Sequence, residues 1–201
     1  MESVKIGSVG LGRLGYEHAK NLAASIPGCV LHAICNVDTS RLRAVAEELG
    51  VPHTYTDFAA MCADPELDGI VIVSPSFLHV EQIKIAMEHG KHVAVEVPAA
   101  QSLDECWQLV NTAEKTQRHC MMLENCVYDF FELTTLNMAQ HGLFGEILHV
   151  EGAYIHNLDE FWDYYQATGA SISTRNTAVT SMPRTAWAPP ASCSTSTAAT
   201  R

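Results

Sequence analysis

Short apolar runs alternate with amphipathic segments along the first 124 residues. The apolar runs are nearly uninterrupted, as expected for strands that helices cover on both faces of a sheet. The expected strands are Val4–Val9, Val30–Val37, His53–Tyr55, Gly69–Val73, His92–Val95 and His119–Leu123. The expected helices are Leu14–Ala24, Arg41–Leu49, a short helix ending near Cys62, Glu81–His89, and a helix from the capping box Ser102–Glu105 to about Lys115. This alternation predicts an α/β fold with a doubly wound parallel sheet of the Rossmann type over residues 1–124.

The pattern changes after Asn125. A helix is expected over Tyr128–His141, with Gly142 as its C-cap. Glu146–Ile155 has the pattern of a strand, the first of a second sheet. We therefore expect residues 125–165 to be the truncated start of a second α/β domain.

The tail, residues 166–201, differs in composition from the rest. Of the last 32 residues, 23 are Ala, Ser, Thr or Pro, and none is Asp, Glu or Gly. No hydrophobic period continues through it, so we expect an irregular segment. A naturally disordered tail is one interpretation, and a second is given below.

Charge and cysteine usage exclude several classes of protein. The net charge of −11 argues against a nucleic-acid partner, which needs clustered Lys and Arg. No apolar run is long enough to cross a membrane and no secretory signal is visible, so the sequence predicts neither membrane association nor export. The seven cysteines are scattered without a Cys-x-x-Cys pair, which favours reduced thiols in a cytoplasmic protein and indicates no metal site.

A glycine-rich motif carries the main chemical signal. Gly10, Leu11, Gly12, Arg13, Leu14 and Gly15 form G-x-G-x-x-G between an expected strand and an expected helix. In that context the first glycine permits a tight turn, the second lets a pyrophosphate approach the backbone, and the third lets helix and strand pack closely. The helix N-terminus adds free N–H groups and positive dipole for the phosphates. The motif predicts a dinucleotide site.

The residues after the second expected strand bear on the choice of cofactor. An acid there would bind the ribose 2′-hydroxyl and repel a 2′-phosphate. The expected position holds Asn36, with Asp38 two residues on and Arg41 near enough to meet a phosphate. NAD is the expected cofactor, and NADP is not excluded.

Two further loops follow expected strands and should border the cofactor. Ser74, Pro75, Ser76 and His79 follow the fourth strand. They either contact the cofactor or start a helix, with Ser76 as N-cap and His79 exposed.

Glu96 and Val97 end the fifth strand, where a carboxylate could reach the substrate or the nicotinamide ribose. A cap for the following helix is the competing interpretation of Glu96, although Ser102 already has that role.

These residues together resemble the glucose-fructose oxidoreductase and inositol dehydrogenase family, Gfo/Idh/MocA. The resemblance lies in VGLGRLGYEHAKNLA, IVSPSFLHVEQI and GKHVAVEVP and covers residues 4 to about 165. It implies an N-terminal Rossmann domain, a C-terminal domain that binds a sugar or polyol, and homo-oligomeric full-length relatives. Most family members carry Glu-Lys-Pro at the fifth strand, where the lysine assists proton transfer during hydride exchange. Val97 replaces that lysine here, so simple alcohol-dehydrogenase chemistry is in doubt.

The segments VAVEVPAAQSLDECW and HCMMLENCVYDFFELTTLNMAQHGLFGEILHVEGAYIHNL resemble the family 109 glycosidases. Those α-N-acetylgalactosaminidases keep NAD bound, oxidise the sugar transiently, eliminate the aglycone, add water and reduce again. The resemblance implies cofactor contacts by Glu96, Val97, Asn125 and the Ser76–His79 stretch. It implies a substrate contact by Tyr154, and His156 nearby is a second candidate catalytic residue.

The two resemblances divide the chain. Residues up to about His92 look more like inositol dehydrogenases, and residues after Val93 look more like the glycosidases. A subfamily with mixed features explains this, as does a chimeric gene joined near Gly90–Val93.

The tail can also be read in another frame. Family 109 members continue past this point with segments such as K-H-R-G-D-V-Y-A-T-H-G-L-G-P and D-I-H-R-G-D. Met182 is encoded by ATG and Pro183 by CCN. In a frame one base earlier, the last base of the first codon and the first two bases of the second form GCC, which encodes alanine. Codons for Arg175 to Pro189 permit the first segment throughout, and those for Ser194 to Thr200 permit the second. The sequence therefore predicts a frameshift between about Tyr165 and Gly169.

Three functions remain open at this stage. The first is an NAD(P)-dependent oxidoreductase acting on a sugar or polyol, of which this chain would bind cofactor without turnover. The second is an NAD-dependent glycosidase, and the third is a non-catalytic dinucleotide sensor.

Overall fold

The computed structural model describes residues 3–24, 26–124 and 127–151. The chain divides into two compact units, Met1–Asp129 and Phe130–Arg201. The first unit is an α/β domain, and within the second the structure describes one helix and the loop after it.

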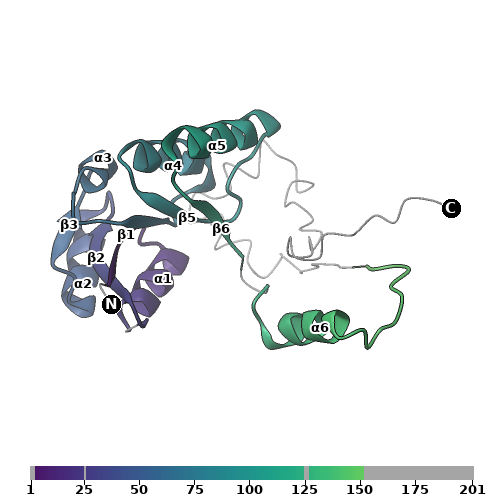
Figure 1. Cartoon of the computed structure of the whole chain (residues 1–201). Helices are drawn as coiled ribbons and strands as arrows, with labels where there is room; N and C mark the ends of the chain where they lie inside the picture. Colours follow the sequence, from purple (N-terminus) through teal and green to yellow (C-terminus); the bar gives the residue numbers. More distant parts are fainter. Residues whose placement is uncertain (1–2, 25, 125–126, 152–201) are drawn as a thin grey trace, which may run out of the picture. The chain divides into compact units, whose positions relative to one another are not determined.

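Six parallel strands form the sheet of the first unit, in the order β3-β2-β1-β4-β5-β6 (Figure 1). They are β1 (Val4–Val9), β2 (Cys29–Cys35), β3 (His53–Tyr55), β4 (Gly69–Ile72), β5 (His92–Glu96) and β6 (Cys120–Leu123). This order is that of a Rossmann domain, whose crevice lies where the winding reverses, here between β1 and β4. The predicted doubly wound parallel sheet is confirmed.

Helices cover both faces of the sheet. They are α1 (Arg13–Ala23), α2 (Thr39–Leu49), α3 (Phe58–Cys62), α4 (His79–Glu88) and α5 (Leu103–Thr116), with a short 3-10 turn, η1 (Ser76–Leu78), before α4. Leu42 and Val45 of α2 pack with Leu31 and Ile34 of β2 in one buried cluster. A second cluster on the other face joins strand residues to α3 and α4, with α5 packed against it. Figure 1 shows α1 and α2 on one side of the sheet and α4 and α5 on the other.

Local sequence signals account for several helix ends. The predicted capping box is present, because the Ser102 Oγ accepts from the Glu105 N–H while the Glu105 carboxylate accepts from the Ser102 N–H. The last described helix is α6 (Phe130–Gln140). Gly142 follows it with φ +70°, and the Leu143 N–H bonds to the Met138 carbonyl, as in a glycine-capped helix end.

The strand expected over Glu146–Ile155 is wrong as far as the structure describes it. Residues 146–151 have no strand structure, and residues 152–155 lie outside the described residues. An extended segment needs a neighbouring strand to satisfy its N–H and C=O groups, and the described part of this unit offers none. The apolar pattern of the segment was therefore insufficient to form a strand.

Candidate functional site

The glycine-rich turn between β1 and α1 is fixed by backbone contacts. Gly10 has φ +87°, and its N–H donates to the carbonyl of Cys35 over 3.0 Å. A Cβ on Gly10 would stand 2.6 Å from the Val73 carbonyl oxygen, so the loops after β1 and β4 touch here. Only glycine combines this φ with such a close approach.

Gly12 and Gly15 have different roles in the turn. A Cβ on Gly15 would overlap the Gly10 carbonyl oxygen, so Gly15 lets α1 pack against the turn. A Cβ on Gly12 would meet no atom within 4 Å. Gly12 is exposed and is the N-cap of α1, without a side-chain cap, and the first turn of α1 carries no acid. An open backbone at an acid-free helix N-terminus fits a pyrophosphate.

The other residues of the motif divide between interior and surface. Arg13 and Leu14 are exposed in the first turn of α1, beside Gly12. Leu11 is buried, and its N–H donates to the Asn36 Oδ1 over 3.2 Å. The Leu11 amide is therefore already bonded within the protein.

Two of the three candidate ribose-binding residues after β2, Asn36 and Arg41, contact this turn. Asn36 bonds Leu11 as described, and its Nδ2 donates to the Asp38 carbonyl over 3.3 Å. Arg41 donates from Nε to the Leu11 carbonyl over 3.1 Å, and its guanidinium lies 5.0 Å from the centre of the Tyr16 ring. These contacts make Asn36 and Arg41 supports of the turn as well as candidates for cofactor contact.

Asp38 has a structural role that its sequence position did not reveal. It is the N-cap of α2, and its Oδ1 accepts from the N–H groups of Ser40 and Arg41. One carboxylate oxygen is therefore engaged in capping, while the exposed residue brings negative charge close to Arg41. The residues that the sequence assigns to the ribose thus include an exposed carboxylate that caps α2 and a guanidinium that bonds the glycine-rich turn.

The loop after β4 corrects one sequence expectation. A helix does start here, with η1 beginning at Ser76 and α4 at His79, but the expectations that Ser76 is its N-cap and that His79 is exposed are wrong. Pro75 precedes η1 without a side-chain cap, and the His79 side chain is buried, 1% exposed. Its two ring nitrogens lie 2.9 Å from the Pro98 carbonyl and 2.8 Å from the Ser74 carbonyl. The imidazole is therefore buried between backbone carbonyls of two loops, and its N–H can donate to one of them.

His79 thereby joins the strand-end loops after β4 and β5. A second bond, from Gln101 Nε2 to the Ser76 Oγ, joins the same two loops over 2.8 Å. Within the loop after β4, the Ser74 Oγ donates to the side chain of Gln82. The loops that border the crevice are therefore linked to each other directly.

Glu96 is the last residue of β5 and is buried, 7% exposed. Its Oε2 lies 3.1 Å from the Nε2 of His18, a residue of α1 that is 78 positions away in sequence. Val97 follows directly and is half-buried. Nothing in the sequence around His18 marks it as a site residue, and only the tertiary structure brings this α1 side chain to the end of β5.

Three expected site residues, Asn125, Tyr154 and His156, lie outside the described residues. Their roles stay predictions. Among the described helices, none is long and apolar enough to cross a membrane. The five described cysteines, Cys29, Cys35, Cys62, Cys106 and Cys120, are free thiols, and burial raises the pKa of Cys35 and of Cys62 to about 12.

With this geometry established, the comparisons define the class of protein. The family described as "Oxidoreductase family, NAD-binding Rossmann fold" (GFO_IDH_MocA) matches residues 4–124. The chain belongs to this family, and residues 4–124 are its NAD-binding Rossmann domain. A second family, "Glycosyl hydrolase 109, C-terminal domain", matches residues 128–190. That match continues past Gly169, so it does not end where the sequence predicts the frameshift. The frameshift stays a prediction.

Curated relatives narrow the resemblance. The chain is 48% identical over 174 residues to "Glycosyl hydrolase family 109 protein 1" of Bacteroides thetaiotaomicron, covering 82% of this chain and 37% of that protein. It is 47% identical over 163 residues to "Alpha-N-acetylgalactosaminidase" of Bacteroides fragilis, covering 77% of this chain and 38% of that protein. The chain thus spans about two fifths of the length of these relatives.

Solved structures of inositol dehydrogenases share the fold. Apo scyllo-inositol dehydrogenase from Lactobacillus casei aligns with a TM-score of 0.69 at 31% identity, covering 73% of this chain and 44% of that chain. The same enzyme with bound NAD(H) and scyllo-inositol aligns with a TM-score of 0.70 at 27% identity, covering 87% and 50%.

Proposed function

We propose that this chain supplies the cofactor-binding part of an NAD-dependent glycosidase of the family 109 type. The observation that carries the proposal is Val97 beside the buried Glu96 at the end of β5. A valine can neither donate nor accept a proton, so the proton transfer that a lysine would assist has no agent at this position. Identities of 47–48% to the two family 109 relatives support the same choice.

The residues of the first unit have distinct tasks in such an enzyme. The open backbone at Gly12 and the N-terminus of α1 would receive the pyrophosphate. Asn36 and Arg41 would hold the turn and face the ribose. NAD, when bound, supplies reversible removal and return of a hydride. His79 would keep the loops after β4 and β5 together beside it.

A dehydrogenase acting on a sugar or polyol is the second candidate. The solved inositol dehydrogenases that share the fold favour it. The two differ in one measurable respect, because a dehydrogenase releases reduced cofactor in proportion to product, whereas the glycosidase regenerates its NAD in each cycle.

The experiment has a binding arm and an activity arm. The 201-residue chain is titrated with NAD and with NADP, and we expect saturable binding without turnover, because it spans about two fifths of its relatives. A gene with the reading frame restored after about residue 165 is then assayed on nitrophenyl α-N-acetylgalactosaminide with and without NAD, while reduced cofactor is followed by absorbance. Glycoside cleavage without net reduced cofactor supports the glycosidase.

Each of the other outcomes would support a different function. Reduced cofactor accumulating with an inositol or sugar substrate would identify a dehydrogenase. Tight NAD binding with neither activity in the restored form would favour the non-catalytic sensor. Absence of dinucleotide binding by folded protein would contradict all three.

Two finer expectations accompany this proposal. We propose a reducing, cytoplasmic setting, supported by the free thiols at Cys29, Cys35, Cys62, Cys106 and Cys120. We also propose that the full-length enzyme is a homo-oligomer, which sedimentation of the restored form would test.

A further inference from the structure

A buried histidine stands at an irregularity in β2, away from the glycine-rich turn. Ile6 of β1 pairs with Leu31 and Gly7 pairs with Ala33, so His32 is the extra residue of a β-bulge. Bulges redirect side chains and commonly have a functional role. The residue is buried, 7% exposed.

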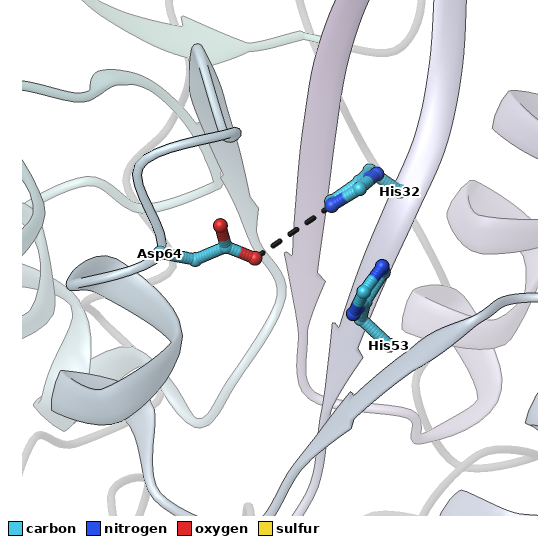
Figure 2. A group of neighbouring side chains, drawn as sticks. All are labelled: His32, His53 and Asp64. Atoms are coloured by element: carbon cyan, nitrogen blue, oxygen red, sulfur yellow. Dashed lines mark ion pairs between the residues drawn. The ribbon is translucent and has the colours of Figure 1, made fainter.

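His32 faces two groups that can bind metal ions, His53 and Asp64 (Figure 2). His53 is the first residue of β3, and its ring stacks on that of His32 with centroids 4.3 Å apart. Asp64 follows α3, and its Oδ2 lies 3.6 Å from His32 Nε2. One ligand atom from each of the three lies within 4.8 Å of those of the other two. Glu66 adds a carboxylate oxygen 3.3 Å from the same His32 nitrogen.

The His32 Nε2 atom is buried and makes no hydrogen bond with any described residue, although these two carboxylate oxygens are close. A buried polar atom without a partner is costly, about 1–3 kcal/mol, and calls for an explanation. Metal coordination would supply one. Zinc binds nitrogen and oxygen at about 2.0–2.2 Å in tetrahedral geometry, which places neighbouring ligand atoms about 3.3–3.6 Å apart. The two His32–carboxylate distances lie close to that separation.

The surroundings hold the Asp64 carboxylate in place. The Tyr55 hydroxyl donates to the Asp64 Oδ2 over 3.0 Å, and the Glu66 N–H donates to the Asp64 Oδ1 over 2.9 Å. Lys91 donates from Nζ to the backbone carbonyls of Asp64 and Leu67, which fixes the loop after α3. Outer contacts of this kind orient the ligands of protein metal sites.

We propose that His32, His53 and Asp64, with Glu66 as a fourth ligand, bind a divalent transition-metal ion of the zinc class. The site would tie β2, β3 and the loop after α3 together and is separate from the dinucleotide site. Glu66 also pairs with Lys5 near the start of β1, whereas the glycine-rich turn follows the other end of that strand. Two nitrogen and two carboxylate ligands favour zinc over calcium or magnesium, which prefer oxygen ligands.

The test measures metal binding directly in the 201-residue chain. Chelator-treated protein is titrated with Zn²⁺ by calorimetry and with Co²⁺ by visible absorption. We expect one equivalent to bind, with a Co²⁺ spectrum of nitrogen and oxygen ligands and no thiolate charge-transfer band. His53→Gln and Asp64→Asn should each weaken binding by more than the roughly 10–100-fold loss typical of outer contacts.

His92→Gln is the matched control. His92 stacks on His119 with centroids 5.1 Å apart and is not part of the three-residue cluster, so its loss should leave metal affinity unchanged. Circular dichroism checks that each variant folds. His53 is substituted in preference to His32 because it lies at the start of a short strand, so the buried bulge at His32 is not disturbed. The proposal is overturned if the folded wild-type chain shows no saturable binding, if the cluster variants bind as the control does, or if Co²⁺ shows thiolate ligation.

Discussion

The carbonyl oxygen of Gly10 occupies the space that a Cβ on Gly15 would need, whereas the space beside Gly12 is open. Two glycines of one motif are thus required for different reasons. Gly15 serves the packing of α1 on the turn, and Gly12 leaves its backbone accessible.

Alanine at each position should separate these two roles. Gly15→Ala should lower the melting temperature, because overpacking costs about 1–3 kcal/mol or more when backbone atoms must move. Gly12→Ala should leave the melting temperature nearly unchanged and weaken NAD binding by about tenfold or more, since the methyl group would meet the pyrophosphate. Thermal unfolding and NAD titration of both variants check this. Equal NAD affinity in Gly12→Ala and the wild type would place the cofactor elsewhere.

Arg41 should influence the choice between NAD and NADP. Its guanidinium lies beside the turn, bonded to the Leu11 carbonyl and packed on Tyr16, where it can attract a 2′-phosphate. Arg41→Met should weaken both cofactors and NADP more, lowering the ratio of NADP to NAD affinity severalfold. Arg43→Met, also exposed on α2, is the control and should leave the ratio unchanged. A ratio unaffected by Arg41→Met would exclude this role.

His79 should contribute to both stability and cofactor affinity. His79→Leu would remove the imidazole N–H that donates to the carbonyl of Ser74 or of Pro98, at a cost of about 1–3 kcal/mol. Looser strand-end loops should also raise the dissociation constant for NAD. Denaturant unfolding and NAD titration measure the two effects. His89→Gln is the control, because His89 is exposed and its one described side-chain hydrogen bond, to the Ile85 carbonyl, lies at the end of its own helix.

His92 should make the stability of the first unit depend on pH. Burial, reinforced by the nearby charges of His119 and Arg118, lowers the pKa of His92 below its ordinary value. Its Nδ1 also accepts the N–H of His119 over 3.0 Å. Between the lowered folded pKa and about 6.5 the unfolded chain binds more protons, so stability falls as pH falls through about 6.5.

The measurement is urea unfolding at several pH values between 7.5 and 5. His92→Gln keeps an acceptor for the His119 N–H but cannot titrate, so its stability should decline less over this range. His89→Gln should decline as the wild type does. A decline in His92→Gln as steep as in the wild type would assign the effect to other groups.

The sequence by itself determined the sheet, the helices and the glycine-rich turn. Apolar runs, capping residues and glycines act on residues close to them in sequence, so the elements that they form can be predicted from the sequence. This is why all six strands of the first unit and the capping box at Ser102 were predicted. The strand over Glu146–Ile155 failed over its described part because a strand depends on a partner that local pattern does not supply.

Only the tertiary structure decided which polar side chains meet. The His18–Glu96 pair and the His32–His53–Asp64 cluster join residues from different elements, and His79 is buried between the carbonyls of Ser74 and Pro98. Such contacts depend on crossover geometry and on one bulge in β2, which no local spacing encodes. The chain's pattern thus predicted the dinucleotide site, and packing decided which side chains surround the glycine-rich turn.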